Sequence, residues 1–370
     1  MKIQCHRPTL AAAFQVVSGV VPARTPKDIL KNVKLEVRDG AAVLCGTDSE
    51  VGIRYALSGV EIEREGETLL PTSSLMAILR EVQDNSVVLE LNDDGILVQA
   101  GHSEFRLQAA DPLEFPPVAG FEATSFHTLT GSVLREAIRR TVFATDTEST
   151  RYALGGVLLD RGGDAITLAA TDSRRLAVVR ITGKSEGNAE DGNAAPVIPS
   201  KAMQLLERSI TEDDQDVSIA VQTNDVLVKS GPAVISARLV EGRFPKYRDV
   251  VPDSSTVSVD LSVGPFLSAV RQAQIVTNDE SRGVDFTFTD GLLKMDSQAA
   301  DVGRSTVELP ISYDAADLTI TFDPRFVAEF LRVLEPENNV RLDLIDAESA
   351  AVFHTDDAYT YVIMPLSRER

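Results

Sequence analysis

At 370 residues, with 43% hydrophobic and 25% charged residues, the chain is long enough for two or three folded domains with ordinary cores. Its 56 acidic residues outnumber 36 basic ones and give a net charge of −20, which argues against indiscriminate binding to nucleic acid or anionic membranes but leaves room for a basic stripe on an acidic body. The two cysteines, Cys5 and Cys45, cannot form a disulfide framework and no Cys/His cluster has metal-site spacing, so we expect a cytoplasmic protein with no metal and no other cofactor.

The N-terminal segment MKIQCHRPTLAAAFQVVSGVVPA has the basic start, apolar stretch and small residues of a secretory signal. Gln15 and Ser18 interrupt the apolar run, however, and Phe14, Val17 and Val21 fall at helical spacing. This pattern favours an amphipathic core helix. No segment of the sequence reaches the roughly 18 apolar residues of a membrane span, so we expect no membrane partner.

Three helical stretches open three similar units of the chain. They are expected at residues 9–19, 132–144 and 264–276, each after a short strand and before a polar turn and an alternating strand. The first two units also share a Thr-Asp-Ser turn, in CGTDSEVGIRYAL around Asp48 and in AATDSRRLAVVRI around Asp172. Such matches at a fixed spacing, about 124 positions here, indicate internal repetition.

A second helix of each unit starts from a matching motif. LLPTSSLMAILREV corresponds to VIPSKAMQLLERSI and, more weakly, to ITFDPRFVAEFLRVL. When Pro71, Pro199 and Asp323 are aligned, an arginine follows nine positions later in every copy. These arginines are Arg80, Arg208 and Arg332. The chain therefore consists of three related units.

Short alternating segments rich in β-branched residues occupy much of the remaining sequence. AITLAATD, DVLVKSG and LTITFD are examples, and they end in turn-forming residues as β-strands do. Each unit is expected to pack two helices on antiparallel sheet, an α+β architecture. The connectors PPVAGFEATSFHT and VVPDSSTVSVD place the domains at 1–124, 125–252 and 253–370, and the Gly-, Asn- and acid-rich segment 183–196 is expected to be a solvated surface loop.

The expected helices are neutral or basic although the chain is strongly acidic. The helix at 132–144, for example, carries Arg135, Arg139 and Arg140 against one acid, Glu136. A solvated helix face would explain any one arginine, but the repeated position in three units favours a function. Six helices about 10 Å wide, side by side in a ring, enclose a hole of roughly 10 Å, and twelve enclose about 30 Å, which passes a DNA duplex. One chain would then form half of a ring, and two would hold DNA by sequence-independent phosphate contacts.

Several motifs together resemble, in order and spacing, the bacterial DNA polymerase III β-subunit family of replication sliding clamps. They are TRYALGGVLL, AATDSRRLAVV, VIPSKAMQLL, ARLVEGRFPKYRDVVP, SRGVDFTF and the terminal YTYVIMPL, and the resemblance covers essentially the whole chain. It implies three processivity-fold (DNA clamp) domains, a head-to-tail homodimeric ring around double-stranded DNA, and no catalytic activity. It also implies loading by an ATP-driven clamp loader and tethering of the replicative polymerase α subunit and of other polymerases and repair proteins with clamp-binding motifs.

The resemblance further implies an apolar pocket between the second and third domains for a short partner peptide, a Gln followed by Leu- and Phe-type residues. Carried over residue by residue, its lining would be Arg151, Leu154, Thr171, Ser173, Arg175, Leu176, Pro245, Val250, Val362, Met364, Pro365 and Leu366. Family DNA contacts would be Arg24, Tyr152 and Lys201, to which the charge argument adds Arg80, Arg139, Arg208 and Arg332. At the ring interface, Phe105 and Leu107 of the first domain would meet Ile275 and Val276 of the third.

Some positions depart from the family pattern. Ala153 stands where Tyr is common, Asp249 where some members have Arg, and Ser173-Arg174 where Gly-His is frequent. Four residues, Ser-Arg-Glu-Arg, extend past the usual end. These departures leave partner selectivity open.

Two other classes of function fit the sequence less well. A metal-dependent phosphoesterase would use Asp48, Asp172 and His102, but the chain has no Gly-rich phosphate loop, nucleophile elbow or His pair. The Thr-Asp pairs also recur where a repeated fold needs a turn, whereas an active site usually occurs once. An acidic three-domain scaffold that never meets DNA would have no need for arginines at one position of three helices.

Overall fold

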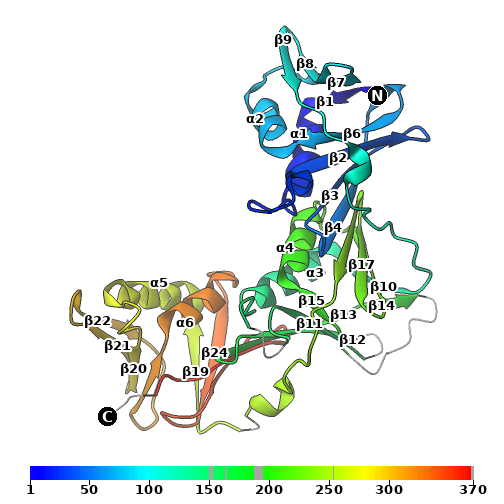
Figure 1. Cartoon of the computed structure of the whole chain (residues 1–370). Coiled ribbons are helices and arrows are strands. Elements are labelled where there is room, and N and C mark those ends of the chain that lie inside the picture. Colours follow the sequence, from blue (N-terminus) through cyan, green and yellow to red (C-terminus); the bar gives the residue numbers. More distant parts are fainter. Residues whose placement is uncertain (150–152, 163–164, 187–194, 253, 368–370) are drawn as a thin grey trace. The chain divides into compact units, whose positions relative to one another are not determined.

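The computed structural model describes residues 1–149, 153–162, 165–186, 195–252 and 254–367 (Figure 1). The chain divides into two compact units. Unit 1 consists of Met1–Arg135 and Thr182–Val240, and unit 2 of Glu136–Ile181 and Glu241–Arg370. Among the described residues, no helix has the length and apolar character needed to span a membrane.

Unit 1 contains two antiparallel sheets. The strand order of the smaller sheet is β5 (Glu61–Arg64), β1 (Lys2–His6), β7 (Ser86–Asn92), β8 (Gly95–Ala100) and β9 (Ser103–Leu107). The order of the larger sheet is β14 (Lys184–Glu186), β10 (Phe126–Thr130), β16 (Asp216–Val221), β17 (Asp225–Ser230), β18 (Ala233–Arg238), β4 (Val51–Leu57), β3 (Ala41–Thr47), β2 (Asn32–Arg38) and β6 (Gly66–Pro71). Helices α1 (Arg7–Ser18) and α2 (Thr72–Glu81) contact each other, while α4 (Ser200–Ser209), which follows β15 (Val197–Pro199), packs on β17 and β18. Two 3-10 turns are η1 (Asp28–Lys31) and η2 (Pro112–Glu114).

Unit 2 also contains two sheets. The first has the order β11 (Gly156–Gly162), β12 (Ala165–Thr171), β13 (Arg175–Thr182), β26 (Tyr359–Ile363), β25 (Ala351–His354), β24 (Asn339–Leu344) and β19 (Val257–Ser262). The second has the order β22 (Gly303–Pro310), β21 (Leu292–Ala299), β20 (Val284–Thr289) and β23 (Leu318–Phe322). Helix α5 (Val263–Ala273) contacts α6 (Pro324–Arg332), and the 3-10 turns are η3 (Tyr247–Val250) and η4 (Gln274–Val276). The boundary between the two units falls within α3 (Gly131–Val142).

Strands from neighbouring repeats share a sheet. In unit 1, β4 of the first repeat pairs with β18 of the second, with the buried Ile53 opposite the buried Ile235. In unit 2, β13 of the second repeat pairs with β26 of the third, with Leu176 opposite Val362. Each of these sheets therefore continues from one repeat into the next. This is why the two compact units divide the second repeat between them, and why three repeats give two compact units.

The second helix of each repeat begins where the aligned motifs predict. Helices α2, α4 and α6 follow directly on Pro71, Pro199 and Asp323, and each has an arginine in its last turn. The Asp323 carboxylate caps α6 by accepting a hydrogen bond from the backbone N–H of Arg325 at 3.0 Å. The three domains are thus α+β repeats with few helices and antiparallel sheets, as predicted.

The opening helices agree with the predicted ranges within three residues. Two details of the prediction differ from the structure, one at the end of a helix and one in a loop. The helix predicted to end at Val276 ends at Ala273, and the last three residues form the 3-10 turn η4. In the predicted loop 183–196, residues Lys184–Glu186 form β14, because they pair with β10, with Ser185 opposite His127. Residues 187–194 of that loop lie outside the described residues.

One turn recurs in equivalent places of the first two repeats. The Asp48 carboxylate accepts hydrogen bonds from the backbone N–H groups two and three residues further on, at 2.9 and 2.8 Å. Asp172 does the same at 2.9 and 3.0 Å. The residue after each aspartate has a left-handed backbone, with φ of 86° at Ser49 and 73° at Ser173. Both aspartates therefore serve as turn-forming residues, and this turn places Ser173 beside the cavity described below.

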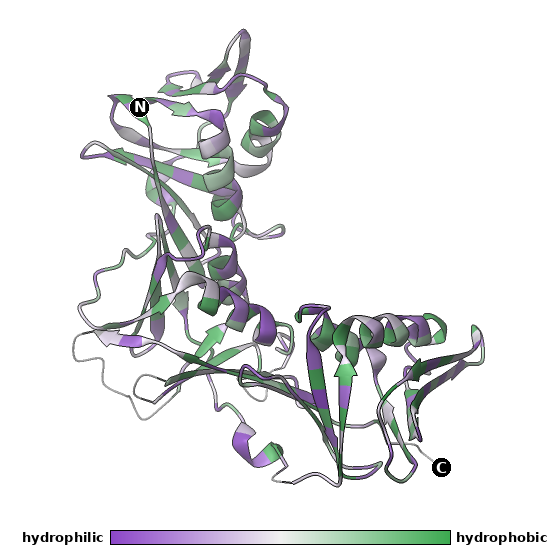
Figure 2. Ribbon diagram, turned by 180° about the vertical axis from the view of Figure 1, so that it is seen from behind, coloured by the Kyte–Doolittle hydropathy of each residue, from purple (hydrophilic) through white to green (hydrophobic). Residues whose placement is uncertain are grey.

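Hydrophobic and hydrophilic residues alternate along the strands of both units (Figure 2), and the hydrophobic ones are buried. In unit 2 an aromatic cluster joins α6 to the first sheet. Phe330 stacks on Tyr361 with ring centroids 4.6 Å apart, and lies 5.1 Å from Phe353. The Tyr361 hydroxyl donates to the backbone carbonyl of Phe326 at 3.0 Å. Burial raises the pKa of Tyr361, so this phenol stays protonated and can keep its hydrogen bond.

Candidate functional site

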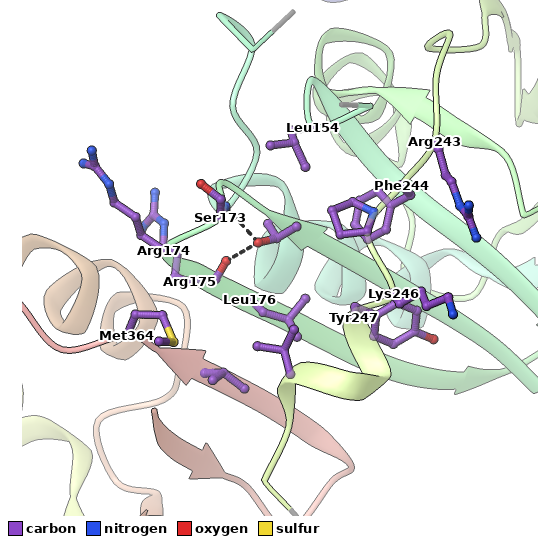
Figure 3. A pocket seen from close by; sticks show the side chains of 14 residues that line it. Leu154, Ser173, Arg174, Arg175, Leu176, Arg243, Phe244, Lys246, Tyr247 and Met364 are labelled. Carbon is purple, nitrogen blue, oxygen red and sulfur yellow. Dashed lines mark hydrogen bonds between the residues drawn. The ribbon is translucent and has the colours of Figure 1, made fainter. Parts of the chain in front are cut away.

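A cavity of about 600 Å³ opens in unit 2 (Figure 3). Its lining is mainly apolar, with a small number of polar groups, as in sites that take a peptide or small ligand. Nine of the twelve predicted pocket residues line it: Leu154, Thr171, Ser173, Arg175, Leu176, Pro245, Val250, Val362 and Met364. These residues are separated by as many as 210 positions in the sequence, and the sheet of unit 2 brings them together.

The floor of the cavity is built by two paired strands. Leu176 of β13 lies opposite Val362 of β26 in the antiparallel register, and both side chains are buried. Thr171, at the end of β12, donates its hydroxyl hydrogen to the carbonyl of Arg175 at 2.6 Å and accepts the backbone N–H of Ser173 at 3.1 Å (Figure 3). Thr171 therefore contributes to a closed turn, and its polar group is already satisfied.

The facing wall is the segment that leads into η3. Phe244 and Tyr247 make an edge-to-face contact with ring centroids 6.3 Å apart, and Pro245 lies between them in the chain. The Tyr247 hydroxyl donates to the Asp160 carboxylate at 3.1 Å, and Arg248 forms an ion pair with the same carboxylate at 2.5 Å. These bonds anchor the wall to β11. The wall is thus held in place without any ligand.

Two apolar side chains at the cavity are unusually exposed. Val250 is 44% exposed and Met364 is 41% exposed, although most large hydrophobic residues of the chain are buried. Methionine adapts its shape to different neighbours because it is unbranched and flexible. An apolar partner that covered both side chains would remove this surface from water.

Arg175 lines the cavity, but its guanidinium is bound within the protein. It forms ion pairs with Asp172 and Glu329, and donates to the backbone carbonyl of Phe143 at 2.7 Å. The guanidinium also lies over the ring of Phe326, 4.5 Å from its centroid. Burial acts to lower the pKa of Arg175, but the neighbouring Tyr361, Glu329 and Asp172 outweigh it and raise this pKa, so the group stays charged. Arg175 therefore supports the wall of the cavity.

The other three predicted pocket residues are Arg151, Pro365 and Leu366. Arg151 lies outside the described residues, and Pro365 and Leu366 do not line the cavity. The backbone N–H of Leu366 donates to the carbonyl of Thr321 at 2.8 Å, so the chain continues along β23 after Met364. Conversely, five lining residues were not predicted: Arg174, Arg243, Phe244, Lys246 and Tyr247. Four of them lie in RFPKY, which is part of a motif that carries the family resemblance but does not indicate which side chains face the cavity.

A second cavity of about 550 Å³ adjoins the first and shares Ser173, Arg174 and Arg175 with it. Its other charged residues are Asp146, Glu148, Asp172, Arg325 and Glu329. The two cavities differ in character, because the first is mainly apolar and the second carries charges of both signs.

The residues predicted to contact DNA lie in different settings. Arg24, Arg80, Arg139, Arg208 and Arg332 are exposed. Lys201 instead donates to the backbone carbonyl of Val20 at 2.9 Å and forms an ion pair with Asp48 at 2.5 Å. Tyr152 lies outside the described residues.

Ion pairs reduce the basic character predicted for the helix at 132–144. Arg135 is ion-paired with Asp213. Arg140 is buried and is ion-paired with Glu136 at 2.5 Å and with Asp357 at 2.6 Å. Asp213 and Asp357, from distant parts of the chain, therefore help to neutralise two of the three arginines, which sequence spacing does not reveal.

The residues predicted for the ring interface lie near the free edges of two sheets. Phe105 and Leu107 are on β9, the last strand of the smaller sheet of unit 1, and both are half-buried. Ile275 and Val276 are in η4, which contacts β22, the last strand of the second sheet of unit 2. Ile275 is 73% exposed. Edge strands present unpaired backbone groups that can pair with another chain.

No cluster of three or more His, Cys, Asp or Glu side chains within the described ranges could hold a metal ion. Asp48 and Asp172 form turns in different units, and His102 is an exposed residue of the turn between β8 and β9. Burial raises the pKa of both Cys5 and Cys45 to about 12, so neither thiol is an ionised nucleophile at neutral pH.

Comparison with known proteins places the whole chain in one family. Models of the DNA polymerase III beta subunit match it over residues 1–119 (N-terminal domain), 128–246 (central domain) and 248–367 (C-terminal domain). The beta sliding clamp of Pseudomonas aeruginosa is 29% identical over 369 residues, with 99% of this chain and all of the relative covered. The beta sliding clamp of Escherichia coli K12 is 27% identical over 373 residues, with 99% of this chain and all of the relative covered.

Solved structures agree with these matches. The DNA polymerase III subunit beta of P. aeruginosa is similar with a TM-score of 0.87 at 29% identity, and both chains are covered in full. The sliding clamp of Bartonella birtlesii, solved bound to griselimycin, is similar with a TM-score of 0.91 at 29% identity, again over both full chains. Sliding clamps of this type are non-catalytic subunits that act in DNA replication. The chain therefore belongs to the DNA polymerase III beta-subunit family of sliding clamps.

Proposed function

We propose that this sliding clamp forms a head-to-tail homodimeric ring that encircles double-stranded DNA in the bacterial cytoplasm. A clamp loader would place it there, and it would tether the replicative polymerase α subunit and other polymerases and repair proteins. The observation that carries the proposal is the full-length match to beta sliding clamps. A ring linked to DNA by topology can slide along it without strong contacts, which explains long residence with weak, sequence-independent binding.

We further propose domain boundaries at 1–124, 125–252 and 253–370. The family models, which match residues 1–119, 128–246 and 248–367, support these positions within a few residues.

The mainly apolar cavity of unit 2 would receive short peptide segments of partner proteins. Its floor, Leu176 and Val362, is buried and held in a sheet, while Val250 and Met364 expose apolar surface at its edge. A pre-formed apolar site lowers the ordering cost of binding a short peptide. Gln-, Leu- and Phe-containing segments are the proposed ligands.

The ring would close through the free sheet edges. Phe105 and Leu107 on β9 of one subunit would meet Ile275 and Val276 near β22 of the other, covering the exposed Ile275. This contact is heterologous, because different surfaces of the two subunits meet. Two such contacts would close a ring of two chains.

Exposed arginines on the helices would contact the DNA backbone. Arg80, Arg208 and Arg332 occupy the last turns of α2, α4 and α6, and Arg24 is exposed in the segment after α1. Arginine binds phosphate through several N–H donors, independently of base sequence. Because Lys201 is paired with Asp48, and Arg80 with Glu81 at 2.9 Å, we give these two a smaller part than Arg24, Arg208 and Arg332.

The molecular mass in solution and the retention of the protein on circular DNA test this function together. Sedimentation equilibrium at low micromolar concentration should give twice 40.0 kDa. Loaded onto nicked circular plasmid with a clamp loader and ATP, the protein should stay on the circle and leave once the plasmid is linearised. A strict monomer across that concentration range, or equal retention on circular and linear DNA, would contradict an encircling dimer.

A further inference from the structure

The lining of the apolar cavity carries charge opposite to that of the chain. Within its described lining there are four cations, Arg174, Arg175, Arg243 and Lys246, and no carboxylate. The whole chain has 56 acidic residues against 36 basic ones. A part of the protein with the average composition of the chain would therefore contain more carboxylates than cations.

Two of these cations lie on one side of the apolar floor and are available to a ligand. Figure 3 shows Arg243 and Lys246 beside Phe244 and Tyr247, away from Arg174. Both are exposed, and no ion pair joins either one to a carboxylate of the described residues. Exposed cations next to an apolar surface can attract a carboxylate on the same ligand that fills the apolar part.

Neighbouring carboxylates on this side are neutralised or do not line the cavity. Asp160 is paired with Arg248 and accepts the hydroxyl of Tyr247. Asp249 and Glu241 are exposed and are absent from the lining. Arg243 and Lys246 therefore give this side of the cavity a positive character.

The side of the cavity at Arg174 differs in its charge. The second cavity, which Arg174 shares, contains Asp146, Glu148, Asp172 and Glu329 together with Arg175 and Arg325. Charges of both signs lie close together there, and Asp172 and Glu329 are themselves paired with Arg175. This side offers no net attraction to an acidic residue.

We propose that the partner segment of this clamp carries acidic residues on one side only of its apolar anchor, and that these residues lie against Arg243 and Lys246. The inference rests on the proposed peptide-binding function of the cavity and adds the charge and polarity of the ligand. Apolar residues fill the space over Leu176 and Val362, while the carboxylates fix which end of the segment lies toward Arg243.

Three synthetic peptides test the proposal with the full-length protein. They share one core of Gln, Leu and Phe residues, and have neutral flanks, two acidic residues before the core, or two acidic residues after it. An exposed ion pair changes affinity by up to about fivefold. Because two acidic residues face two cations, one acidic peptide should bind about tenfold tighter than the neutral one at low salt. Fluorescence polarisation should show most of this advantage lost at about 0.5 M salt, because screening weakens exposed pairs.

Substitutions of Arg243 and Lys246 test whether these two cations bind the acidic residues of the peptide. Arg243→Gln combined with Lys246→Gln should remove the advantage of the acidic peptide over the neutral one. Arg180→Gln combined with Arg38→Gln is the matched control, because both are exposed arginines on strands that do not line the cavity and the change in net charge is the same. It should keep the full advantage. Arg243→Glu with Lys246→Glu should make the acidic peptide the weaker ligand.

Several outcomes would overturn the proposal. They are equal affinity of all three peptides, an equal gain from acidic residues on either flank, and an advantage that survives loss of Arg243 and Lys246. If none of the peptides binds, neutral one included, the peptide-binding function of the cavity is wrong and the inference falls with it. The neutral peptide therefore separates failure of the function from failure of the charge proposal.

Discussion

Leu176 of β13 and Val362 of β26 lie directly opposite each other in an antiparallel sheet, although 186 positions separate them in the sequence. The pair connects the second repeat to the third and also forms the floor of the apolar cavity. The same two side chains thus take part in the domain connection and in the proposed binding site. Floor and edge of the cavity should consequently respond differently to mutation.

Leu176→Ala should destabilise the protein by about 2–4 kcal/mol, because it leaves a void among buried side chains. Met364→Ala should change stability by less than about 1 kcal/mol, since Met364 is 41% exposed, yet it should weaken peptide binding. Urea unfolding and peptide titration measure the two effects. Equal loss of stability in both variants would show that Met364 is a core residue as well.

The ion pair of Asp48 with Lys201 should make stability depend on acid pH. Burial acts to raise the pKa of the Asp48 carboxyl, but hydrogen bonds from Lys201 and from the backbone N–H groups of Val51 and Glu50 outweigh it, and the pKa is lowered. Because the folded pKa lies below the unfolded one, this stabilisation is complete above about pH 4 and is lost as the pH falls through the folded pKa.

Asp48→Asn should therefore cost about 1–2 kcal/mol between pH 5 and 7, with the difference from the original protein narrowing below about pH 4. Thermal or urea unfolding at a series of pH values measures it. A difference that stays constant down to about pH 2 would mean that the charge of Asp48 does not contribute.

Ser173→Gly should stabilise the protein by about 1 kcal/mol, because Ser173 has a φ of 73° that glycine adopts without strain. Ser49→Gly, at a φ of 86° in the equivalent turn, should have a similar effect. Ser74→Gly is the control of opposite sign, since Ser74 is exposed within α2 and glycine there should destabilise by about 0.5 kcal/mol. Unfolding midpoints compare the three, and a loss of stability in Ser173→Gly would contradict the strain argument.

Replacing Arg80, Arg208 and Arg332 with glutamine should weaken binding to short duplex DNA and reduce its salt dependence. If each arginine contacts one phosphate, a dimer loses six contacts, and the slope of log K against log salt becomes shallower by about 5. The control variant replaces Arg38, Arg180 and Arg238, exposed arginines on strands, and makes the same change in net charge. Fluorescence anisotropy at several salt concentrations distinguishes them. Equal effects of both variants would point to net charge alone.

Ile275→Asp should convert the dimer into a monomer of 40.0 kDa, because it places a charge in the proposed apolar contact with Phe105 and Leu107. Ile275 is already 73% exposed in the single chain, so the fold should tolerate the change, which circular dichroism can check. Leu113→Asp is the control, as Leu113 is 82% exposed in η2. Sedimentation equilibrium should detect a monomer for the first variant and a dimer for the second. A dimer in both cases would place the interface elsewhere.

Much of the fold follows from local sequence. Pro71, Pro199 and Asp323 mark the starts of α2, α4 and α6, because proline and a capping aspartate act within a few residues of their own position. The turns at Asp48 and Asp172 are local in the same way, since each aspartate binds N–H groups two and three residues away. Repeats, helices and turns were therefore predicted from the sequence, and the family was recognised through motifs of the same kind.

Contacts between residues far apart in the sequence could not be predicted from local motifs. Arg175 is bound by Glu329, 154 positions away, and Lys201 by Asp48, 153 positions away, so two cations predicted to meet a peptide or DNA are held by carboxylates of the protein itself. An isolated arginine or lysine in a sequence looks the same whether it is paired or exposed. The sequence by itself determined the repeated α+β units and the motifs of the cavity. Only the tertiary structure decided which cations stay available, because pairing depends on side chains that the sheets bring together from far along the chain.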